Sequence, residues 1–305
     1  MIYIEKKGII TFGDLMDFKR VDKESFKVAI PYLQNEKINE YGFTPTCVYA
    51  PMDNAKFAKR GEWFVLKFED EGLEHINILG DFKAEGFEVF VKDLLNEFKI
   101  LRFDFLSKEK AEILEKIFAE RVESVKTDET QWDYIYEIND FINMTGKQNR
   151  HKREQYNAFV NNNNFRYEEI NENNKSLCIE ICETWCERKD CSLCEYTCEK
   201  NIIKEIIDNL DCYPVKGGIL YVNETPSAFF IGEVLGDTLM GYHQKTTQPL
   251  IKGLGTAIYI QSLENSFKEI KYFNIGPDLG IDGLKQFKRM FKPFSMVEKY
   301  SMVIK

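Results

Sequence analysis

The order of helix and strand patterns in the second half of the chain constrains the fold more than any other feature. The spacing of apolar residues and the positions of turn formers predict this order. The predicted elements are a helix at 148–162, a strand at 165–169, helices at 174–188 and 195–210, strands at 216–222, 226–234 and 237–243, a helix at 254–268, a strand at 270–275, a helix at 280–290 and one final strand at 295–304. Such alternation predicts an α/β chain with mixed sheets.

The first half alternates in a similar way. We expect strands at 62–68, 74–79, 98–105 and 132–138, and helices at 86–97 and from the N-cap Ser107 to about Ala119. A length of 305 residues exceeds one ordinary domain. The turn formers of 138–148 place the boundary there and predict two domains, residues 1–140 and 141–305.

The charge balance and the apolar pattern exclude several classes of protein. The net charge of −9 opposes a broad nucleic-acid-binding surface. No stretch reaches the roughly 18 apolar residues that a membrane span needs. The first residues lack the basic and then apolar pattern of a secretion signal, so we expect a cytoplasmic protein.

A glycine loop, KTTQPLIKGLGTA (245–257), lies between a predicted strand and a predicted helix. Gly253 and Gly255 allow a ligand to approach the backbone, and the free amides at the start of the helix favour an anion such as a phosphate. Lys252 adds a positive charge, and Thr256 lies in the same turn. The alternative is an ordinary loop before a helix.

A basic segment at 147–153 stands out in this acidic chain. Lys147, Arg150, Lys152 and Arg153 suit phosphates of a tRNA end, of coenzyme A or of a lipid head group. The alternative is a solvated helix face, the usual explanation for a run of charges.

Six of the eight cysteines fall between 178 and 198. Cys191 and Cys194 form a CxxC pair, and with Cys186 and Cys198 they make a candidate structural zinc site. An iron–sulfur cluster, a redox sensor, or reduced thiols at a helix–helix contact are the alternatives.

The last third carries the most distinctive residues: Lys245, Asn274, Asp278, Leu279, Gly280, Gly283, Leu284, Lys288 and Pro293. With the segment from Thr145 to Arg153, they resemble the phosphatidylglycerol lysyltransferase C-terminal family over about residues 40–305. The element order resembles that of GNAT acyltransferases. The resemblance implies a tandem of two GNAT-like domains that passes an aminoacyl group from aminoacyl-tRNA to an acceptor, with the transfer site in the second domain.

Acyl transfer needs a proton acceptor and donors for the developing oxyanion. Glu233 and Asp278 are the candidate bases, Lys245 and Lys288 candidates for holding a phosphate or the oxyanion, and His243 a candidate proton shuttle. We expect the donor to contact Lys252, Gly253, Gly255, Thr256, Asn274 and Lys288. The alternatives are a solvated strand end for Glu233, a helix cap for Asp278 and a plain polar residue for His243. We expect the glycine turn, Lys245 and Asp278 to share one cleft, walled in part by the N-terminal half.

Three functions follow from these residues. The first is an acyl or aminoacyl transferase that takes its group from aminoacyl-tRNA or acyl-coenzyme A and passes it to an amine or hydroxyl of a small molecule or lipid head group. The second is an acetyl-coenzyme A-dependent N-acetyltransferase. The third is a non-catalytic module that binds phosphorylated ligands or RNA.

Overall fold

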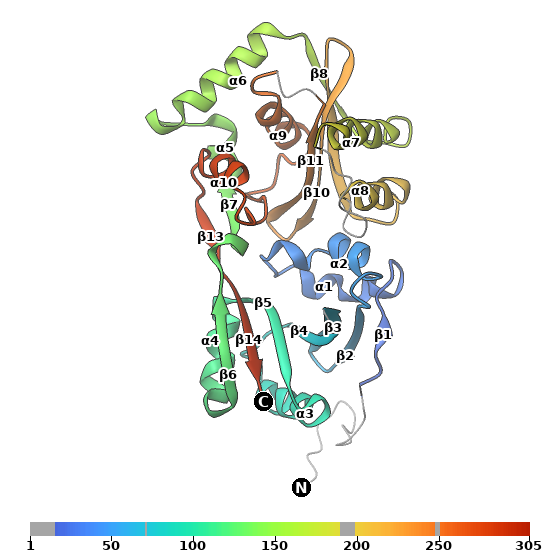
Figure 1. Cartoon of the computed structure of the whole chain (residues 1–305), viewed down its shortest axis with the longest axis vertical. Coiled ribbons are helices and arrows are strands. Elements are labelled where there is room, and N and C mark those ends of the chain that lie inside the picture. The colour runs from blue at the N-terminus through green and yellow to red at the C-terminus, as the bar shows by residue number, and fades with distance from the viewer. Residues whose placement is uncertain (1–15, 71, 190–198, 248–250) are drawn as a thin grey trace.

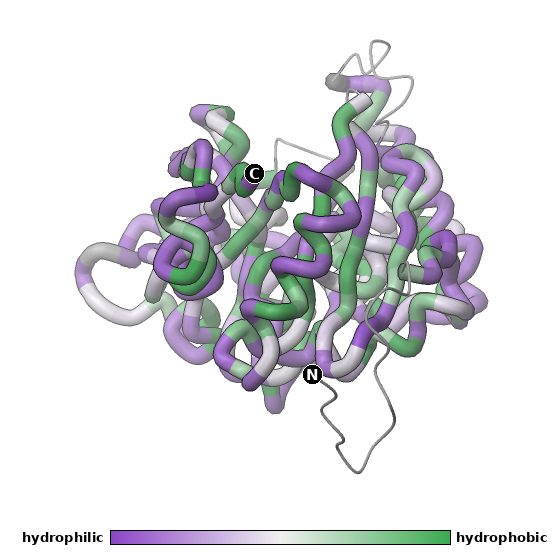
Figure 2. The backbone as a smooth tube through the Cα atoms, turned by 90° about the horizontal axis from the view of Figure 1, so that it is seen from below, coloured by the Kyte–Doolittle hydropathy of each residue, from purple (hydrophilic) through white to green (hydrophobic). Residues whose placement is uncertain are grey.

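The computed structural model describes residues 16–70, 72–189, 199–247 and 251–305. Two lobes stack along the long axis of the molecule, and helices α1 (Ile30–Leu33) and α2 (Phe43–Tyr49) lie between them (Figure 1). In Figure 2, hydrophobic and hydrophilic residues alternate along the peripheral helices. Such alternation is typical of helices that pack an apolar face against a core.

The lower lobe holds two sheets. An antiparallel sheet has the order β1-β2-β3-β4, and a second sheet has the order β5-β14-β6. The elements are β1 (Lys19–Arg20), β2 (Lys56–Arg60), β3 (Trp63–Asp70), β4 (Leu73–Leu79), α3 (Phe87–Phe98), β5 (Leu101–Ser107), α4 (Lys108–Phe118), β6 (Val122–Thr127) and β14 (Lys299–Ile304). The predicted N-cap is confirmed, since the Ser107 hydroxyl accepts the Lys110 amide at 3.3 Å.

The upper lobe is built on one sheet with the order β13-β7-β12-β11-β10-β9-β8. Its strands are β7 (Asp133–Glu137), β8 (Phe165–Glu169), β9 (Val215–Val222), β10 (Thr225–Leu235), β11 (Thr238–Thr246), β12 (Tyr272–Asn274) and β13 (Ser295–Val297). Its helices are α5 (Ile138–Asn143), α6 (Arg150–Asn162), α7 (Ser176–Lys189), α8 (Glu199–Asp208), α9 (Leu254–Ser266) and α10 (Asp282–Arg289). Helices α7 and α8 cover one face of the sheet, and α9 with α5 and α6 covers the other (Figure 1).

The single final strand predicted at 295–304 is wrong. The structure has two strands there, in different lobes: β13 pairs with β7, and β14 pairs with β5 and β6. A continuous apolar pattern cannot show that the chain changes sheets at Glu298. Strand β7 precedes residue 140 but belongs to the upper sheet, so the two sheets exchange strands across the proposed boundary. A division at residue 140 stays a proposal.

Strands β11 and β12 run parallel and then part. Their pairing stops at Met240 and Asn274, whereas β11 continues to Thr246. A register shift leaves Tyr242 without a partner in β10, and such a bulge bends the strand at that point. The connection after β11 leads to Gly253, which precedes α9 with a φ of 86°. The strands therefore open around the start of that helix.

Candidate functional site

A cavity of about 270 Å³ lies at the start of α9. It is lined by Ile251 to Thr256, by Gln244 and Thr246 of β11, by Lys152 and Gln155 of α6, and by Phe287 of α10. The structure thus brings together four residues predicted to bind the donor, Lys252, Gly253, Gly255 and Thr256, with Lys152 of the basic segment.

The glycine turn exposes backbone donors to this cavity. The Leu254 amide bonds to the Ile251 carbonyl and the Ala257 amide to the Gly253 carbonyl. The amides of Gly255 and Thr256 lie between these two, among the first N–H groups of a helix, which have no acceptor inside it. A Cβ on Gly253 would lie 2.7 Å from the Gln155 carbonyl oxygen, so only glycine permits this approach.

Lys152 is a buried cation without a carboxylate partner among the residues the structure describes. Its side chain is only 6% exposed. Its Nζ lies 4.7 and 4.8 Å from the ring centres of Phe287 and Phe291. Burial lowers the pKa of this ammonium to about 8. An ammonium held in this way is costly to bury unless an anion binds beside it.

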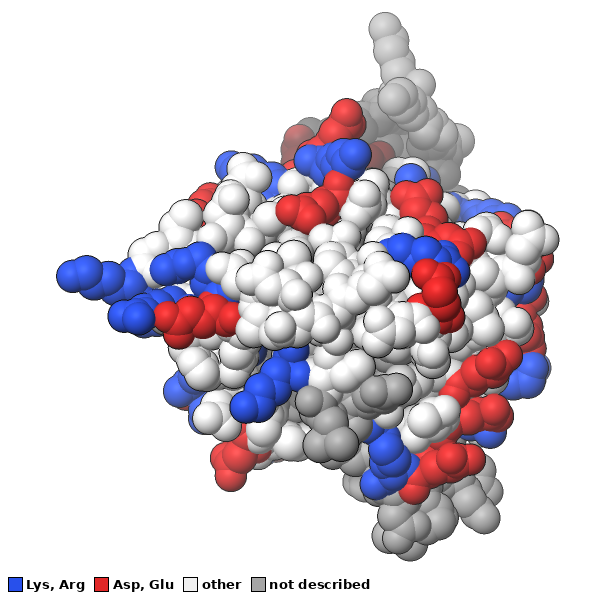
Figure 3. Space-filling view, turned by 90° about the horizontal axis from the view of Figure 1, so that it is seen from above, with Lys and Arg blue, Asp and Glu red and all other residues white. Residues whose placement is uncertain are grey.

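The other predicted basic residues point elsewhere. Lys147 is exposed, Arg150 pairs with Glu154 at 2.7 Å, and Arg153 donates to the Met144 and Gly146 carbonyls. Figure 3 shows Lys and Arg side chains projecting at the left edge of the upper face, where α6 begins. Only Lys152 among the four lines the cavity.

His243 and Lys245 lie on the opposite face of β11 from the glycine turn, because alternate residues of a strand point to opposite faces. His243 Nδ1 lies 3.0 Å and Lys245 Nζ 2.6 Å from Glu199 Oε1, and Lys245 also lies 4.1 Å from the Trp185 ring centre. Burial opposes ionisation of Glu199, but the hydrogen bond from His243 and the charge of Lys245 outweigh it and lower its pKa to about 2.

Glu233 joins the two lobes. Its carboxylate accepts the amides of Phe43 and Thr44, at the start of α2, at 3.0 and 2.9 Å, and it accepts the Tyr242 hydroxyl at 3.1 Å. Its side chain is buried, so it is not the solvated strand-end charge considered from the sequence. Burial raises its pKa above the ordinary value.

The motif residues Asn274, Asp278 and Lys288 shape the loop after β12. Lys288 donates to the carbonyls of Ile275, Gly276 and Pro277, and burial lowers its pKa to about 8. Asp278 accepts the Tyr134 hydroxyl at 2.6 Å and the Gly280 amide at 2.9 Å.

Asn274 donates to Asp133 and to the Lys37 carbonyl, which ties this loop to the lower lobe. Asn274, Asp278 and Lys288 do not line the glycine-turn cavity.

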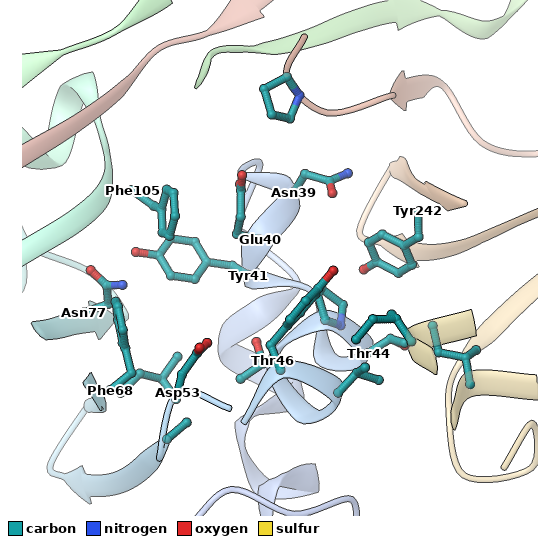
Figure 4. Close-up of a pocket in the computed structure, with 18 of the residues that line it drawn as sticks. Asn39, Glu40, Tyr41, Thr44, Thr46, Asp53, Phe68, Asn77, Phe105 and Tyr242 are labelled. Atoms are coloured by element: carbon teal, nitrogen blue, oxygen red, sulfur yellow. The ribbon is translucent and has the colours of Figure 1, made fainter. Parts of the chain in front are cut away.

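A larger cavity, of about 400 Å³, lies between the lobes (Figure 4). Glu40, in the 3₁₀ turn Asn39–Tyr41, lies between Phe105 on one side and Asn39 and Tyr242 on the other. Burial and the neighbouring Asp133 raise the pKa of Glu40 to about 7, against the opposing effect of Lys299.

The sequence analysis missed this interlobe cavity and Glu40. Its walls come from distant segments, including Thr46, Phe68, Asn77, Phe105 and Tyr242. The Lys299 ammonium that holds Glu40 lies 259 positions away in the sequence. No local pattern around Glu40 signals this contact.

Strand β11 is the element that both cavities share among the described residues. Tyr242 and His243 line the interlobe cavity, whereas Gln244 and Thr246 line the glycine-turn cavity. The single cleft expected from the sequence is therefore divided in two. Lys245 and Asp278 line neither part, and His243 is the one predicted catalytic residue that lines a cavity.

The predicted zinc site cannot be placed. Cys191, Cys194 and Cys198 lie outside the described residues, and Cys186 is half-buried on α7. Across the described ranges, no group of three His, Cys, Asp or Glu side chains is arranged to hold a metal ion. In the same ranges, no helix combines the length and apolar character needed to cross a membrane.

Comparison with known proteins gives one family. The model of the phosphatidylglycerol lysyltransferase C-terminal family matches residues 79–303. No curated protein matches the chain.

Solved structures show the same fold at low sequence identity. A conserved protein of unknown function from Bacteroides thetaiotaomicron superposes with a TM-score of 0.88, at 22% identity over 95% of this chain and 100% of the other. The C-terminal domain of a putative lysylphosphatidylglycerol synthetase from Agrobacterium fabrum gives 0.64, at 12% identity over 92% and 91%. FemX gives 0.61, at 9% identity over 94% and 97%. The fold is the mixed α/β fold of tandem GNAT proteins.

Proposed function

Because the chain belongs to the phosphatidylglycerol lysyltransferase C-terminal family, we propose that it transfers an acyl or aminoacyl group from a donor held by its phosphates at the glycine turn. Members of this fold include transferases, and the chain shares their architecture. We propose the glycine turn as the donor site and acyl or aminoacyl transfer as the reaction.

The observation that carries the proposal is Lys152. An ammonium 6% exposed, with no carboxylate partner in the described part of the chain, lines a cavity that also receives the first amides of α9. A phosphate there would pair with the ammonium and accept from the Gly255 and Thr256 amides at the positive end of the helix. Lys252, exposed at the rim, adds a second positive charge.

The donor is proposed to be aminoacyl-tRNA, as the family resemblance implies, with acyl-coenzyme A as the alternative. Both carry phosphates and an activated acyl group. In aminoacyl-tRNA a phosphate lies one ribose away from the ester, and in acyl-coenzyme A the pantetheine arm separates the diphosphate from the thioester. The exposed Lys147, in the turn before α6, adds positive charge outside the cavity, which suits a polyanion longer than coenzyme A.

The acceptor is proposed to bind in the interlobe cavity, on the other side of β11. The parting of β11 from β12 after Met240 is where the acyl group would pass from one cavity to the other. Enzymes of this kind gain rate mainly by holding two reactants in contact and by excluding water. His243, which lines the acceptor side, is positioned by Glu199 and is proposed to take part in proton transfer.

The test is donor binding and transfer in matched variants. Total tRNA charged with labelled amino acids, and labelled acetyl-coenzyme A, are incubated with the protein and a metabolite extract, and label released into small products is measured. Lys152→Met should lower donor affinity at least tenfold, since a charge-assisted bond contributes about 1.5–3 kcal/mol. Lys268→Met, which removes an exposed lysine outside both cavities, should leave affinity unchanged.

The outcomes separate the three functions. Label leaving only acetyl-coenzyme A would favour an N-acetyltransferase, and binding without any transfer would favour a module for phosphorylated ligands. If neither donor nor a nucleoside diphosphate binds the wild-type protein, the proposal fails.

A further inference from the structure

Resting on the proposed function, we propose that the interlobe cavity takes a primary amine as the acceptor. Glu40 binds the ammonium of that amine and accepts the proton that it loses. The family resemblance leaves the acceptor open between an amine and a hydroxyl, and the chemistry of this cavity decides between them.

The carboxylates of Glu40 and Asp133 are balanced by one ammonium, so a second cation beside Glu40 would be favourable. Both Glu40 carboxylate oxygens lie 2.6 Å from Lys299 Nζ, and the same ammonium lies 2.6 Å from Asp133 Oδ1. Asp133 is fully buried, and its second oxygen accepts the Asn39 amide and the Asn274 side chain. One ammonium thus serves two carboxylates. Only Glu40 of the two reaches the cavity, where its side chain is 31% exposed.

The other groups that face Glu40 do not supply this charge. The Lys288 ammonium is bound to three backbone carbonyls. Tyr41, Tyr49 and Tyr242 also line the cavity, and burial raises the pKa of each phenol, which keeps it neutral. Asp53 lines it as well, but it is a carboxylate and brings no positive charge. His243 and Lys67 also line the cavity, but they pair with Glu199 and Glu74.

The walls of the cavity suit an amine with an apolar body. The aromatic rings of Tyr49, Phe68, Phe105 and Tyr242 line it. Aromatic faces attract ammonium groups and cover apolar surface. Phe105 has a φ of 55°, a conformation that is strained for a bulky residue, and its ring centre lies 5.7 Å from Lys299 Nζ. Strain retained in a cavity wall beside a charged cluster is typical of a binding site.

The pKa of Glu40, about 7, suits the exchange of a proton near neutral pH. The acceptor ammonium gives one proton to the Glu40 carboxylate, and its nitrogen attacks the acyl carbon. The C–N bond forms while the C–O bond of the ester, or the C–S bond of a thioester, breaks. The second proton of the nitrogen passes to the leaving oxygen or sulfur, and Glu40 then releases its proton to solvent.

The first test measures binding alone, with phenethylamine and its neutral analogue 2-phenylethanol as probes, by calorimetry on the whole chain. We expect the amine to bind at least tenfold more tightly than the alcohol. Glu40→Gln should remove this preference without weakening the alcohol. The substitution leaves Lys299 paired with Asp133. Glu36→Gln is the matched control, because it removes a buried carboxylate held at 2.6 Å by Lys110 outside the cavity.

Equal affinity for the two probes, or an amine preference that survives Glu40→Gln, would overturn the inference. ADP affinity at the glycine turn, measured on the same samples, shows whether Glu40→Gln is folded. It also tests the donor site separately. If the wild-type protein does not bind ADP, the result counts against the proposed donor site. It does not count against the inference that the interlobe cavity binds an amine.

The second test examines the product of the transfer assay. An amine acceptor gives an amide, and the label should then survive mild alkali. A hydroxyl acceptor gives an ester, which alkali cleaves, and an alkali-labile product would overturn the inference while leaving transfer itself established.

Discussion

Both lobes contain a unit of strand, glycine loop, helix and strand, but the surroundings of the glycine turn differ between them. In the lower lobe, β4 leads through a glycine loop to α3 and then to β5, and in the upper lobe β11 leads through a glycine loop to α9 and then to β12. Both helices follow a glycine with positive φ, of 89° at Gly86 and 86° at Gly253. The backbone design is therefore repeated.

The side chains around the two turns differ. In the lower lobe, Trp63 stacks on Phe90 at 4.8 Å and donates its indole N–H to the Asp81 carbonyl, and Phe82 stacks on Phe87 at 4.3 Å. In the upper lobe, the corresponding region is a cavity with a buried lysine. One turn is filled by aromatic rings and is structural. The other is left open and is suited to a ligand.

Replacing the aromatic ring at the closed turn should have the largest effect. Trp63→Ala removes a side chain only 8% exposed, and such truncations cost about 3–5 kcal/mol. Urea unfolding should show this loss, while ADP affinity per folded molecule stays unchanged. Trp132→Ala, at a half-buried position, is the control and should cost less. A fall in ADP affinity with Trp63→Ala would mean that the lower turn also binds anions.

At the open turn, stability and binding should respond in opposite directions. Lys152→Met removes an unpaired buried charge and should raise the free energy of unfolding of the unliganded protein by roughly 1–3 kcal/mol. Thermal unfolding with and without ADP measures both effects, because a ligand stabilises only the protein that binds it. Destabilisation by Lys152→Met would show that the lysine has a partner in the folded chain and would weaken the contrast between the two turns.

The glycines of the open turn form a matched pair. Gly253→Ala should cost more than about 1 kcal/mol, because φ is 86° and the new Cβ would meet the Gln155 carbonyl at 2.7 Å. Gly255→Ala should be tolerated, since the nearest atom is Gln244 Nε2 at 3.5 Å. Thermal unfolding compares the two variants. Equal losses would show that the turn relaxes and does not depend on glycine at 253.

The smallest effect is a pH dependence. Burial lowers the Lys152 pKa to about 8, so the ammonium is charged below that pH and neutral above it. ADP affinity should fall as the pH rises through 8. The free energy of unfolding of the unliganded protein should rise as the pH increases from 8 towards the pKa of lysine in the unfolded chain. In this range the unfolded chain binds more protons than the folded protein. Lys152→Arg should abolish the fall in affinity, and a fall that persists in this variant would assign it to another group.

Much of the fold was predictable because the nearly continuous apolar runs of β9, β10 and α9 mark elements that are buried on all sides. The glycine turn was predicted from local sequence. The inward position of Lys152 beside it was not, because the basic segment does not show which of its four cations faces a cavity. What failed depends on contacts between distant segments. The split between β13 and β14 is invisible in a single apolar run, and Glu40 acquires its environment from Asp133 and Lys299.

From the family motif, Asp278 was predicted to act as a base, and Asn274 and Lys288 to contact the donor. In the folded chain Lys288 and Asp278 bond to backbone groups and to Tyr134, and they hold a loop in shape. A sequence pattern cannot show whether a charged side chain points into a cavity or into its own backbone. The roles predicted for Glu233, Lys245 and Asp278 stay predictions.

The exchange of strands between the sheets has a consequence for biosynthesis. Strand β14 lies between β5 and β6, yet the ribosome makes it after every element of the upper lobe. When residues 1–127 have been translated, β5 and β6 are still without the strand that lies between them. The second sheet of the lower lobe forms only after residues 299–304 have been made. If the gene were cut near codon 140, the first fragment would lack β14, which its own sheet needs. The second fragment would lack β7, which the upper sheet needs.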